Sequence, residues 1–359
     1  MKPYSPAKLP LNDIDYNYFI EGLSEANRSL ARFDGMLESI PNKYIFLTPF
    51  MTQEAVLSSK IEGTQATFQE VLEFEANTNK NREKKDDILE IKNYRMAMGH
   101  AVSKLNSVPL CTRLIKEMHE ILMNDVRGSS KDPGNFRKTQ NWIGKPNSTI
   151  EDASFVPPQP EKLNDIMTNF EKYLNYEDKD IIVQAAIMHA QFEIIHPFLD
   201  GNGRIGRMLI PLLFYSKKIM SEPVFYISSS FEKNRNDYYA NLNTITSTGN
   251  WNDWISFFIY SINEQSNEYI LKTKKIKNLY EGYKDRVSDI TKSQKIIQIL
   301  DTLFTVPVFR SVQFSELSGI PQKTCERNIR QLYEDGILTS DDQEKQRTYI
   351  FKDLLDLMN

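Results

Sequence analysis

The sequence has few cysteines and histidines and no long apolar run. Two cysteines, Cys111 and Cys325, lie far apart in 359 residues. This spacing excludes a disulfide framework and a zinc ribbon, and it favours a reducing, cytoplasmic setting. The four histidines are too scattered for a His-rich metal site. The N-terminus lacks the apolar core of a signal peptide, and no segment is apolar for long enough to cross a bilayer. We therefore expect no membrane partner.

Charge of either sign is not in excess. The chain carries 44 basic and 48 acidic residues, a formal charge of −4. This balance excludes a generally basic protein that coats nucleic acid, although a local basic patch would still be compatible with it. The hydrophobic share of 40% and the charged share of 26% are those of a globular protein. The length predicts roughly two domains with a large core.

Apolar residues recur at helical spacing through most of the chain, so we expect a mainly α-helical fold. The segment 181–195 is apolar nearly all round, which predicts a buried central helix. The linker is expected near 274–293. We expect an N-terminal helical extension over 1–110, a core domain over 111–275 and a small domain over 276–359. The other predicted helices are 51–60, ending at Gly63, and 86–105, 111–123, 162–175, 202–217, 238–246 and 251–275.

Two regions break the helical pattern. Residues 132–159 are rich in proline and glycine, with short apolar runs at Trp142–Ile143 and Phe155–Val156. They predict two short strands around a turn. From about Lys292, the order helix, helix, glycine turn, helix, strand predicts a winged helix-turn-helix domain. Residues 285–359 contain ten basic and twelve acidic residues. This charge favours a protein–protein or dimerisation role over DNA binding, which stays an alternative.

The stretch His196–Arg207, HPFLDGNGRIGR, carries the chemistry. It follows the predicted buried helix and opens the next one. Glycines on either side of Asn202 let backbone N–H groups converge at a helix N-terminus, which is an anion site. Arg204 and Arg207 add donors for phosphate oxygens. Asp200 can hold Mg²⁺, and His196 can act as a general base. Packing alone does not require this combination, so the stretch indicates a phosphate site with a base beside it.

The same stretch resembles the Fic (Fic/Doc) signature HxFx(D/E)GNGRxxR at every specified position. The resemblance extends through PGNFRKTQNWIG, FVPPQP, FEKNRNDYYANL and GNWNDWISFF, and so covers roughly residues 51–260. It implies a Fic-type helical core with a β-hairpin flap that includes Phe155 and Val156. It also implies transfer of AMP from ATP to a Ser, Thr or Tyr hydroxyl of a protein, which is another protein or this protein itself.

The resemblance assigns roles to residues of this chain. It makes His196 the catalytic base and Asp200 the ligand of Mg²⁺. It places Phe198 in the core as the anchor of the loop. Arg204 would meet the β-phosphate and Arg207 the γ-phosphate. The ATP-binding residues that it implies are Glu62, His196, Gly201, Asn202, Gly203, Arg204, Ile205, Gly206, Arg207, Tyr238 and Tyr239; the two tyrosines would line the adenosine pocket.

A second motif, Ser58 to Gly63, fits the pattern (S/T)xxxE(G/N). In Fic proteins that carry this pattern it forms an inhibitory helix. Glu62 would make a bidentate ion pair with Arg207 and so occupy donors that the ATP γ-phosphate needs. A helix end capped by Gly63 is the plain structural interpretation, and it is compatible with the inhibitory one.

Two other functions remain open. One is a different reaction on the same scaffold, such as removal of AMP or transfer of another phosphate-linked group. The other is a winged-helix regulator whose core senses nucleotide. A homodimer is compatible with all of them. The sequence names neither the target protein nor the signal that relieves inhibition.

Overall fold

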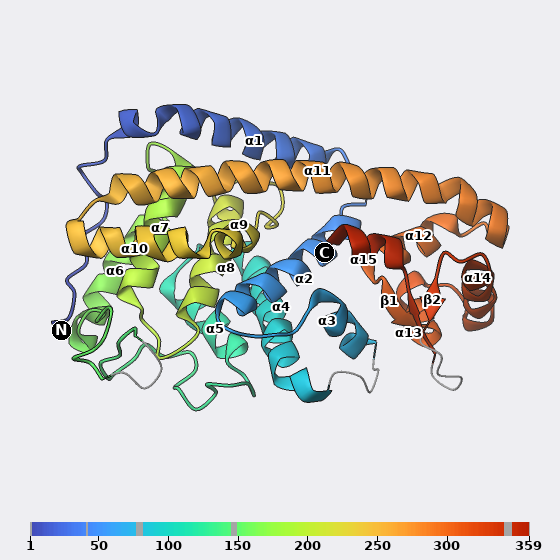
Figure 1. Cartoon of the computed structure of the whole chain (residues 1–359), viewed down its shortest axis with the longest axis horizontal. Coiled ribbons are helices and arrows are strands. Elements are labelled where there is room, and N and C mark those ends of the chain that lie inside the picture. Colours follow the sequence, from blue (N-terminus) through green and yellow to red (C-terminus); the bar gives the residue numbers. More distant parts are fainter. Residues whose placement is uncertain (1, 41, 77–81, 145–148, 341–346, 359) are drawn as a thin grey trace.

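The computed structural model describes residues 2–40, 42–76, 82–144, 149–340 and 347–358 (Figure 1). The described chain is mainly helical, as predicted, with one small sheet. Its α-helices are α1 (Ile20–Glu38), α2 (Tyr44–Ile61), α3 (Phe68–Glu75), α4 (Lys85–Leu105), α5 (Thr112–Leu122), α6 (Leu163–Leu174), α7 (Ile181–Ile195), α8 (Asn202–Ser216), α9 (Ser228–Lys233), α10 (Arg235–Thr248), α11 (Trp251–Thr291), α12 (Ile296–Thr305), α13 (Ser311–Ser318), α14 (Gln322–Glu334) and α15 (Lys352–Met358). The 3₁₀ turns are η1 (Tyr16–Tyr18), η2 (Arg82–Lys84) and η3 (Pro160–Lys162).

Helix α7 is the buried centre of the bundle, as its apolar sequence predicts. Nearly all of its residues are buried, and it packs against α6, α8 and α11. Asp180 caps its N-terminus by accepting hydrogen bonds from the amides of Ile182 and Val183 at 2.8 and 3.3 Å. Asn27 of α1 donates to the other carboxylate oxygen at 2.8 Å. The cap therefore fixes where α7 begins and joins it to the N-terminal extension.

The predicted linker at 274–293 is wrong. Helix α11 runs without interruption over 41 residues to Thr291, and Figure 1 shows it along the full length of the molecule beside α1. Buried side chains recur along its second half: Ile276, Tyr280, Tyr283, Val287 and Thr291. The charged residues between them suggested a linker, but they lie on the solvent-facing side of the same helix.

The C-terminal segment packs onto this helix and onto α2. Strands β1 (Val308–Arg310), β2 (Thr339–Ser340) and β3 (Thr348–Ile350) form an antiparallel sheet in the order β1-β3-β2, with Val308 opposite Ile350 and Thr339 also opposite Ile350. Helix α12 packs against α2, and the carbonyl of Met358 in α15 accepts a hydrogen bond from Gln53 of α2. Helices α12, α13 and α14 and strand β3 follow the predicted order, and β1, β2 and α15 are additional elements. The winged-helix assignment stays a prediction.

The proline-rich region 132–159 forms less β-structure than predicted. Its described residues form a single antiparallel bridge, between Ile143 and Phe155, and part of the turn lies outside the described residues. The backbone of Val156 is also committed elsewhere, because its carbonyl accepts a hydrogen bond from the amide of Tyr4 at 2.9 Å. Pro157 and Pro158, which follow Val156 directly, lack the N–H donors that a longer strand would need.

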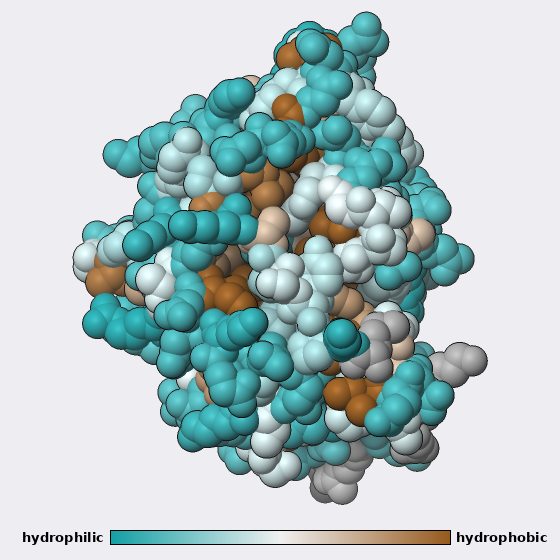
Figure 2. All heavy atoms as spheres, turned by 90° about the vertical axis from the view of Figure 1, so that its left-hand side faces the viewer, coloured by the Kyte–Doolittle hydropathy of each residue, from teal (hydrophilic) through white to brown (hydrophobic). Residues whose placement is uncertain are grey.

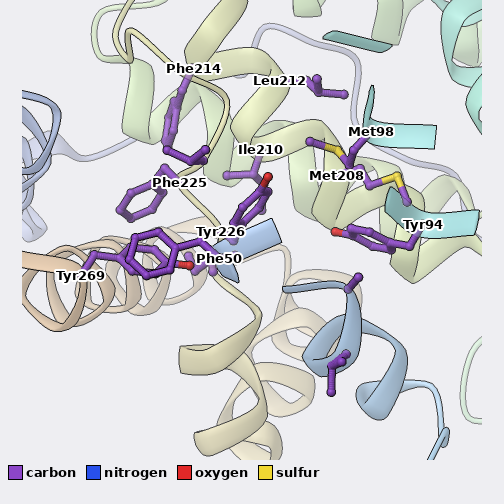
Figure 3. Close-up of a cluster of buried hydrophobic side chains, with 14 of the residues drawn as sticks. Phe50, Tyr94, Met98, Met208, Ile210, Leu212, Phe214, Phe225, Tyr226 and Tyr269 are labelled. Carbon is purple, nitrogen blue, oxygen red and sulfur yellow. The ribbon is translucent and has the colours of Figure 1, made fainter. Parts of the chain in front are cut away.

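The core is continuous from the N-terminal extension to the C-terminal sheet. Aromatic rings fill its middle. Figure 3 shows Phe50 of α2, Phe225 and Tyr269 of α11 together, and the ring centroids of Phe50 and Tyr269 lie 4.8 Å apart. At the end of the molecule drawn in Figure 2, hydrophobic atoms form small patches separated by hydrophilic ones. No helix within the described ranges is long and apolar enough to span a membrane.

Replacement of Asp180 by Ala should lower the free energy of unfolding by about 1–2 kcal/mol, because two amides at the start of α7 lose their acceptor. Asp180→Ser retains a capping oxygen and should lose less. Chemical denaturation followed by circular dichroism measures both. Equal stability of wild type and the Ala variant would contradict the importance of this cap.

Candidate active site

The turn between α7 and α8 is built from residues with left-handed backbone conformations. His196 follows the last residue of α7 with φ 49° and ψ 58°, an uncommon conformation for a residue with a Cβ. Gly201 has φ 76° and precedes the first residue of α8. The chain therefore reverses within six residues, and His196 comes to lie beside the N-terminus of α8.

Two buried side chains hold this turn from inside. Asn202 accepts from the amide of Phe198 and donates to its carbonyl, both at 2.9 Å. The ring of Phe198 is buried, as predicted, and stacks on His119 of α5 with centroids 3.7 Å apart. His119 accepts the Gly134 N–H at Nδ1 and therefore donates from Nε2 to the carbonyl of Asp200, at 2.9 and 3.0 Å. Its neutral form is thus fixed by its neighbours, and burial lowers its pKa to about 4.

The imidazole of His196 presents a free nitrogen. Its Nδ1 lies 3.3 Å from the carbonyl of Glu193. Since a carbonyl only accepts, Nδ1 carries the proton and Nε2 carries the lone pair. Burial lowers the pKa of His196 to about 4. At neutral pH the side chain is an unprotonated acceptor, which is the state that a general base requires.

The N-terminal turn of α8 provides the anion site. The amides of its first residues have no acceptor within the helix, and the helix dipole favours negative charge there. Gly203 lies in this turn with Glu62 against it: a Cβ at position 203 would collide with Glu62 Oε1 and come within 2.9 Å of Arg207 Nη1. Glycine at 203 is therefore needed for a ligand or a carboxylate to approach the helix end.

Arg207 is 1% exposed and is held by the end of α2. Its Nη2 donates to Glu62 Oε1 at 2.7 Å and to the carbonyl of Ser58 at 2.9 Å, and its Nε donates to Ser58 Oγ at 2.8 Å. The expected bidentate pair with Glu62 is therefore wrong: Glu62 accepts one hydrogen bond, from Nη2, and Ser58 accepts the bond from Nε and a second one from Nη2. Burial opposes ionisation of Glu62, but the charges of Arg207 and Arg204 hold its pKa below the usual value. Gly63 follows with φ 104°.

Arg204 is not free in this structure. Its Nη1 donates to Glu90 of α4 at 2.8 Å, and both side chains are buried. Its Nη2 lies 3.6 Å from Asp200 Oδ1 and 3.8 Å from Met123 Sδ, and its Nε is buried with no hydrogen-bond partner among the described residues. Arg127 also approaches Glu90, with its Nε 3.4 Å from Oε1. The sequence assigned Arg204 to a phosphate, and Glu90, 114 positions away, was missed because no local pattern marks it.

Asp200 lies at the rim of the site. Its Oδ1 accepts the Gly201 N–H at 2.7 Å, and its Oδ2 lies 3.2 Å from Lys131 Nζ. Burial opposes its ionisation, but Arg204 and Lys131 hold its pKa below the usual value. The described residues contain no cluster of three or more His, Cys, Asp or Glu side chains that could cage a metal ion. A single ionised carboxylate beside an anion site fits Mg²⁺ that arrives with phosphates.

The two tyrosines of α10 lie differently from each other. Tyr238 is buried and its hydroxyl lies 3.0 Å from His189 Nε2, so it belongs to the core. Tyr239 is 46% exposed and lines a cavity of about 390 Å³ between α7, α10 and the two segments that the Ile143–Phe155 bridge joins, which we call the bridge region. The other lining residues are Ile143, Ser154, Phe155, Glu193, Ile194, Leu242, Asn243 and Thr246. Of the predicted pair, only Tyr239 faces this cavity.

Ile205 and Gly206, which were also predicted to bind ATP, are packed inside the protein. Ile205 is fully buried. Gly206 lies under Glu193, whose Oε1 would collide with a Cβ there. Burial raises the pKa of Glu193 to about 8.

Glu54 of α2 was not predicted, although it precedes Ser58 by one helical turn. Its carboxylate accepts hydrogen bonds from the hydroxyl of Tyr94 at 3.0 Å and from Ser228 Oγ at 2.6 Å. Burial raises its pKa to about 7. The sequence pattern that could have revealed Glu54 is an acidic residue on the face of a predicted helix that turns toward the core, where acidic residues are rare.

His119 should make stability depend on pH. Unfolded histidine binds a proton below about pH 6.5, whereas folded His119 stays neutral down to about pH 4, so its contribution to stability rises with pH across that window. The unfolding free energy of His119→Gln should therefore be flatter than that of wild type by about 1.4 kcal/mol per pH unit. Asn169→Ala, which removes two hydrogen bonds to Leu9, is the control and should keep the wild-type slope. Parallel slopes for His119→Gln and wild type would contradict the neutral assignment.

Comparison with known proteins agrees with this geometry. Residues 20–103 match the Fic/DOC family N-terminal model and residues 109–214 match the Fic/DOC family model, which together cover more than half of the chain. The Caenorhabditis briggsae "Protein adenylyltransferase fic-1" is 35% identical over 115 residues, 29% of this chain and 21% of that protein. The Drosophila grimshawi "Protein adenylyltransferase Fic" is 33% identical over 135 residues, 36% of this chain and 25% of that protein.

The chain thus spans about a quarter or less of the length of these curated relatives. A solved structure of a Fic family protein from Desulfovibrio desulfuricans G20 superimposes with a TM-score of 0.60 at 16% identity and covers 98% of both chains. A Fic domain containing signaling protein from Bacteroides thetaiotaomicron covers 70% of this chain and 97% of that one, with a TM-score of 0.54 at 19% identity. In sequence, in fold and in the turn between α7 and α8, the chain belongs to the Fic/DOC family.

Proposed function

We propose that this protein is a protein adenylyltransferase. It transfers AMP from ATP to a Ser, Thr or Tyr hydroxyl of a target protein and releases pyrophosphate. One observation carries the proposal: an unprotonated His196 lies beside the N-terminus of α8, where amides and two arginines converge. The naming of the matched relatives as protein adenylyltransferases supports the same reaction.

The reaction follows from the position of each group. His196 Nε2 takes the proton of the target hydroxyl, and the hydroxyl oxygen attacks the α-phosphorus. A P–O bond forms to the target as the P–O bond to pyrophosphate breaks. The amides around Gly201–Gly203 donate to the phosphate oxygens as negative charge develops on them. Asp200 would hold Mg²⁺, which neutralises charge on the phosphates when bound.

The arginines and the cavity would hold the rest of ATP. Arg207 would bind the γ-phosphate once Glu62 has left it. Arg204 would meet the β-phosphate through Nη2, which lies 3.6 Å from Asp200 Oδ1, while its Nη1 stays on Glu90. The cavity beside Tyr239 is apolar with an aromatic wall, as a nucleobase site requires. Ile194 and Phe155 would contact the base there.

The end of α2 would inhibit the enzyme. Glu62 and Ser58 occupy three donor contacts of Arg207, and Glu62 lies against Gly203 where a phosphate would approach. Its negative charge would repel a triphosphate at the same position. ATP would then bind with misaligned phosphates, so transfer would be slow until the end of α2 moves.

The exposed edge of the bridge region would present the target. Trp142 and Ile143 are exposed there, and an extended peptide could pair with the backbone at this edge. The protein itself is included among its targets. A homodimer, a cytoplasmic setting and a protein-binding role for a C-terminal winged helix belong to the same proposal, with DNA binding not favoured by the charge of that segment. The mass added to a target distinguishes AMP transfer from other phosphate-linked transfers and from AMP removal.

Glu62→Gly should raise incorporation of AMP, because Arg207 becomes available to the γ-phosphate. A charge-assisted hydrogen bond of about 1.5–3 kcal/mol corresponds to a gain of about ten- to a hundredfold. The measurement is incorporation from α-labelled ATP, including self-modification, at equal enzyme concentration. Glu62→Gln keeps the shape without the charge and should give a smaller gain. Equal incorporation by wild type and Glu62→Gly would remove Glu62 as the inhibitor.

His196→Ala in the Glu62→Gly background should abolish transfer and leave ATP binding within about threefold of the parent, because other groups hold the phosphates. Calorimetry measures binding and α-labelled ATP measures transfer. Near-parental transfer by the double variant would rule out His196 as the base. Absence of transfer from Glu62→Gly itself, with any protein in a lysate, would overturn the proposed reaction.

A further inference from the structure

Arg137 is a buried cation, 2% exposed, and its side-chain hydrogen bonds within the described ranges all go to backbone carbonyls. In the sequence it follows α5 and precedes the Ile143–Phe155 bridge. Its Nε donates to the carbonyl of His196 at 2.9 Å, and its Nη2 donates to the carbonyls of Pro158 and Ile195 at 2.5 and 3.4 Å. Its Nη1 reaches the carbonyl of Thr139 at 3.4 Å. One guanidinium thus joins the end of α7 to both arms of the bridge region.

Burial of the Arg137 guanidinium costs free energy unless other groups stabilise its charge. Within the described ranges no carboxylate lies in ion-pair distance of Arg137, and burial lowers its pKa to about 10, so it remains a cation at neutral pH. Burying a charge without a partner is unfavourable. The compensation comes from the C-terminal end of α7, where carbonyls lack helical partners and the helix dipole is negative. Only a planar fork with several donors can serve the two carbonyls of Ile195 and His196 together with that of Pro158.

The same end of α7 carries the base. His196 adopts the left-handed conformation, which costs free energy in a residue with a Cβ and persists only when its surroundings enforce it. The Arg137 amide adds a hydrogen bond to the carbonyl of Pro197 at 2.9 Å. Asn141, four residues later, donates from Nδ2 to the carbonyl of Phe198 at 3.2 Å. The carbonyls of Ile195 through Phe198 are therefore all held from one segment.

We infer that Arg137 is a positioning residue for the transfer reaction: it fixes the backbone of the His196 turn and locks that turn to the bridge region that presents the target. The inference rests on the proposed function. Asn141 acts in the same way on the far side of the turn. The same guanidinium holds the turn that carries His196 and the bridge region that would bind the target. The position of the base relative to the target hydroxyl is therefore fixed.

The inference predicts a loss in the chemical step rather than in nucleotide binding. Arg137 contacts neither the N-terminus of α8 nor the cavity beside Tyr239. Displacement of a catalytic group by about 1 Å costs about a hundredfold in rate. A lysine at 137 keeps the charge but cannot reach three carbonyls from one nitrogen, so it should not restore the geometry.

The experiment compares Arg137→Lys, Arg137→Gln and Asn141→Ala in the full chain with Glu62→Gly. Arg286→Lys is the control, since Arg286 also donates to a backbone carbonyl, that of Asp335, but on the surface of the C-terminal segment. Steady-state labelling with α-labelled ATP gives kcat and the KM for ATP. Thermal unfolding and calorimetric ATP binding report on the folded state.

Both Arg137 variants should lose about thirty- to a hundredfold in kcat with the KM for ATP and the ATP affinity within about threefold of the parent. Asn141→Ala should lose about three- to tenfold in the same parameter, and the control should match the parent. Folded Arg137 variants with kcat within threefold of the parent would overturn the inference, as would a loss confined to KM. If the Arg137 variants unfold, an unchanged kcat in folded Asn141→Ala would overturn it. A parent that shows no transfer would refute the proposed function instead.

Discussion

The contact on which the site depends is the one between Arg207 of α8 and the end of α2. A guanidinium buried this deeply requires acceptors for its donors, and Ser58 and Glu62 supply three contacts from a segment about 150 positions earlier. The charge of Glu62 raises the pKa of Arg207 although burial opposes ionisation. The N-terminal extension is thereby joined to the N-terminal turn of α8, where the carboxylate of Glu62 lies against Gly203.

Contacts from the middle of α2 to its end fix the position of this helix. In the middle, Glu54 is held by Tyr94 of α4 and by Ser228 at the start of α9. Arg235 of α10 donates to the carbonyl of Ile61 at 2.6 Å. At mid-helix, Gln53 links the carbonyl of Met358 to Lys272 of α11. The C-terminal segment and the contact with Arg207 are therefore joined through one helix, and Figure 1 shows α15 beside α2.

The turn that bears His196 is supported by a second set of contacts that is independent of α2. Phe198 stacks on His119, Asn202 closes the loop by hydrogen bonds to Phe198, and Arg137 holds the carbonyl side. All of these groups are buried and their donors and acceptors are aligned before any ligand arrives. In the proposed reaction, such preorganisation would let the site stabilise developing charge without rearrangement. The carboxylate of Glu62, whose side chain is 34% exposed, is not part of this second set of contacts.

Local sequence determined a large part of this molecule. The unbroken apolar run of α7 could only be a central helix, and the glycines around Asn202 could only be a turn into a new helix, so the bounds of α7 were predicted to the residue and those of α8 to within one. The motif also singled out His196, Asp200 and Arg207 as candidate site residues, because anion binding and proton transfer need those residue types within a few positions of one another.

Only the tertiary structure decided which partners these residues have. Glu90, His119 and Arg137 are separated from the groups they contact by 59 to 114 positions, and no periodicity encodes such a distance. The same limit explains the errors. The charged second half of α11 was predicted to be a linker, because the sequence does not show that its buried face packs against the C-terminal helices. Tyr238 was predicted to line a pocket, because the sequence does not show that its hydroxyl contacts His189. Burial depends on the neighbours that folding supplies, and the linear pattern shows only one side of each contact.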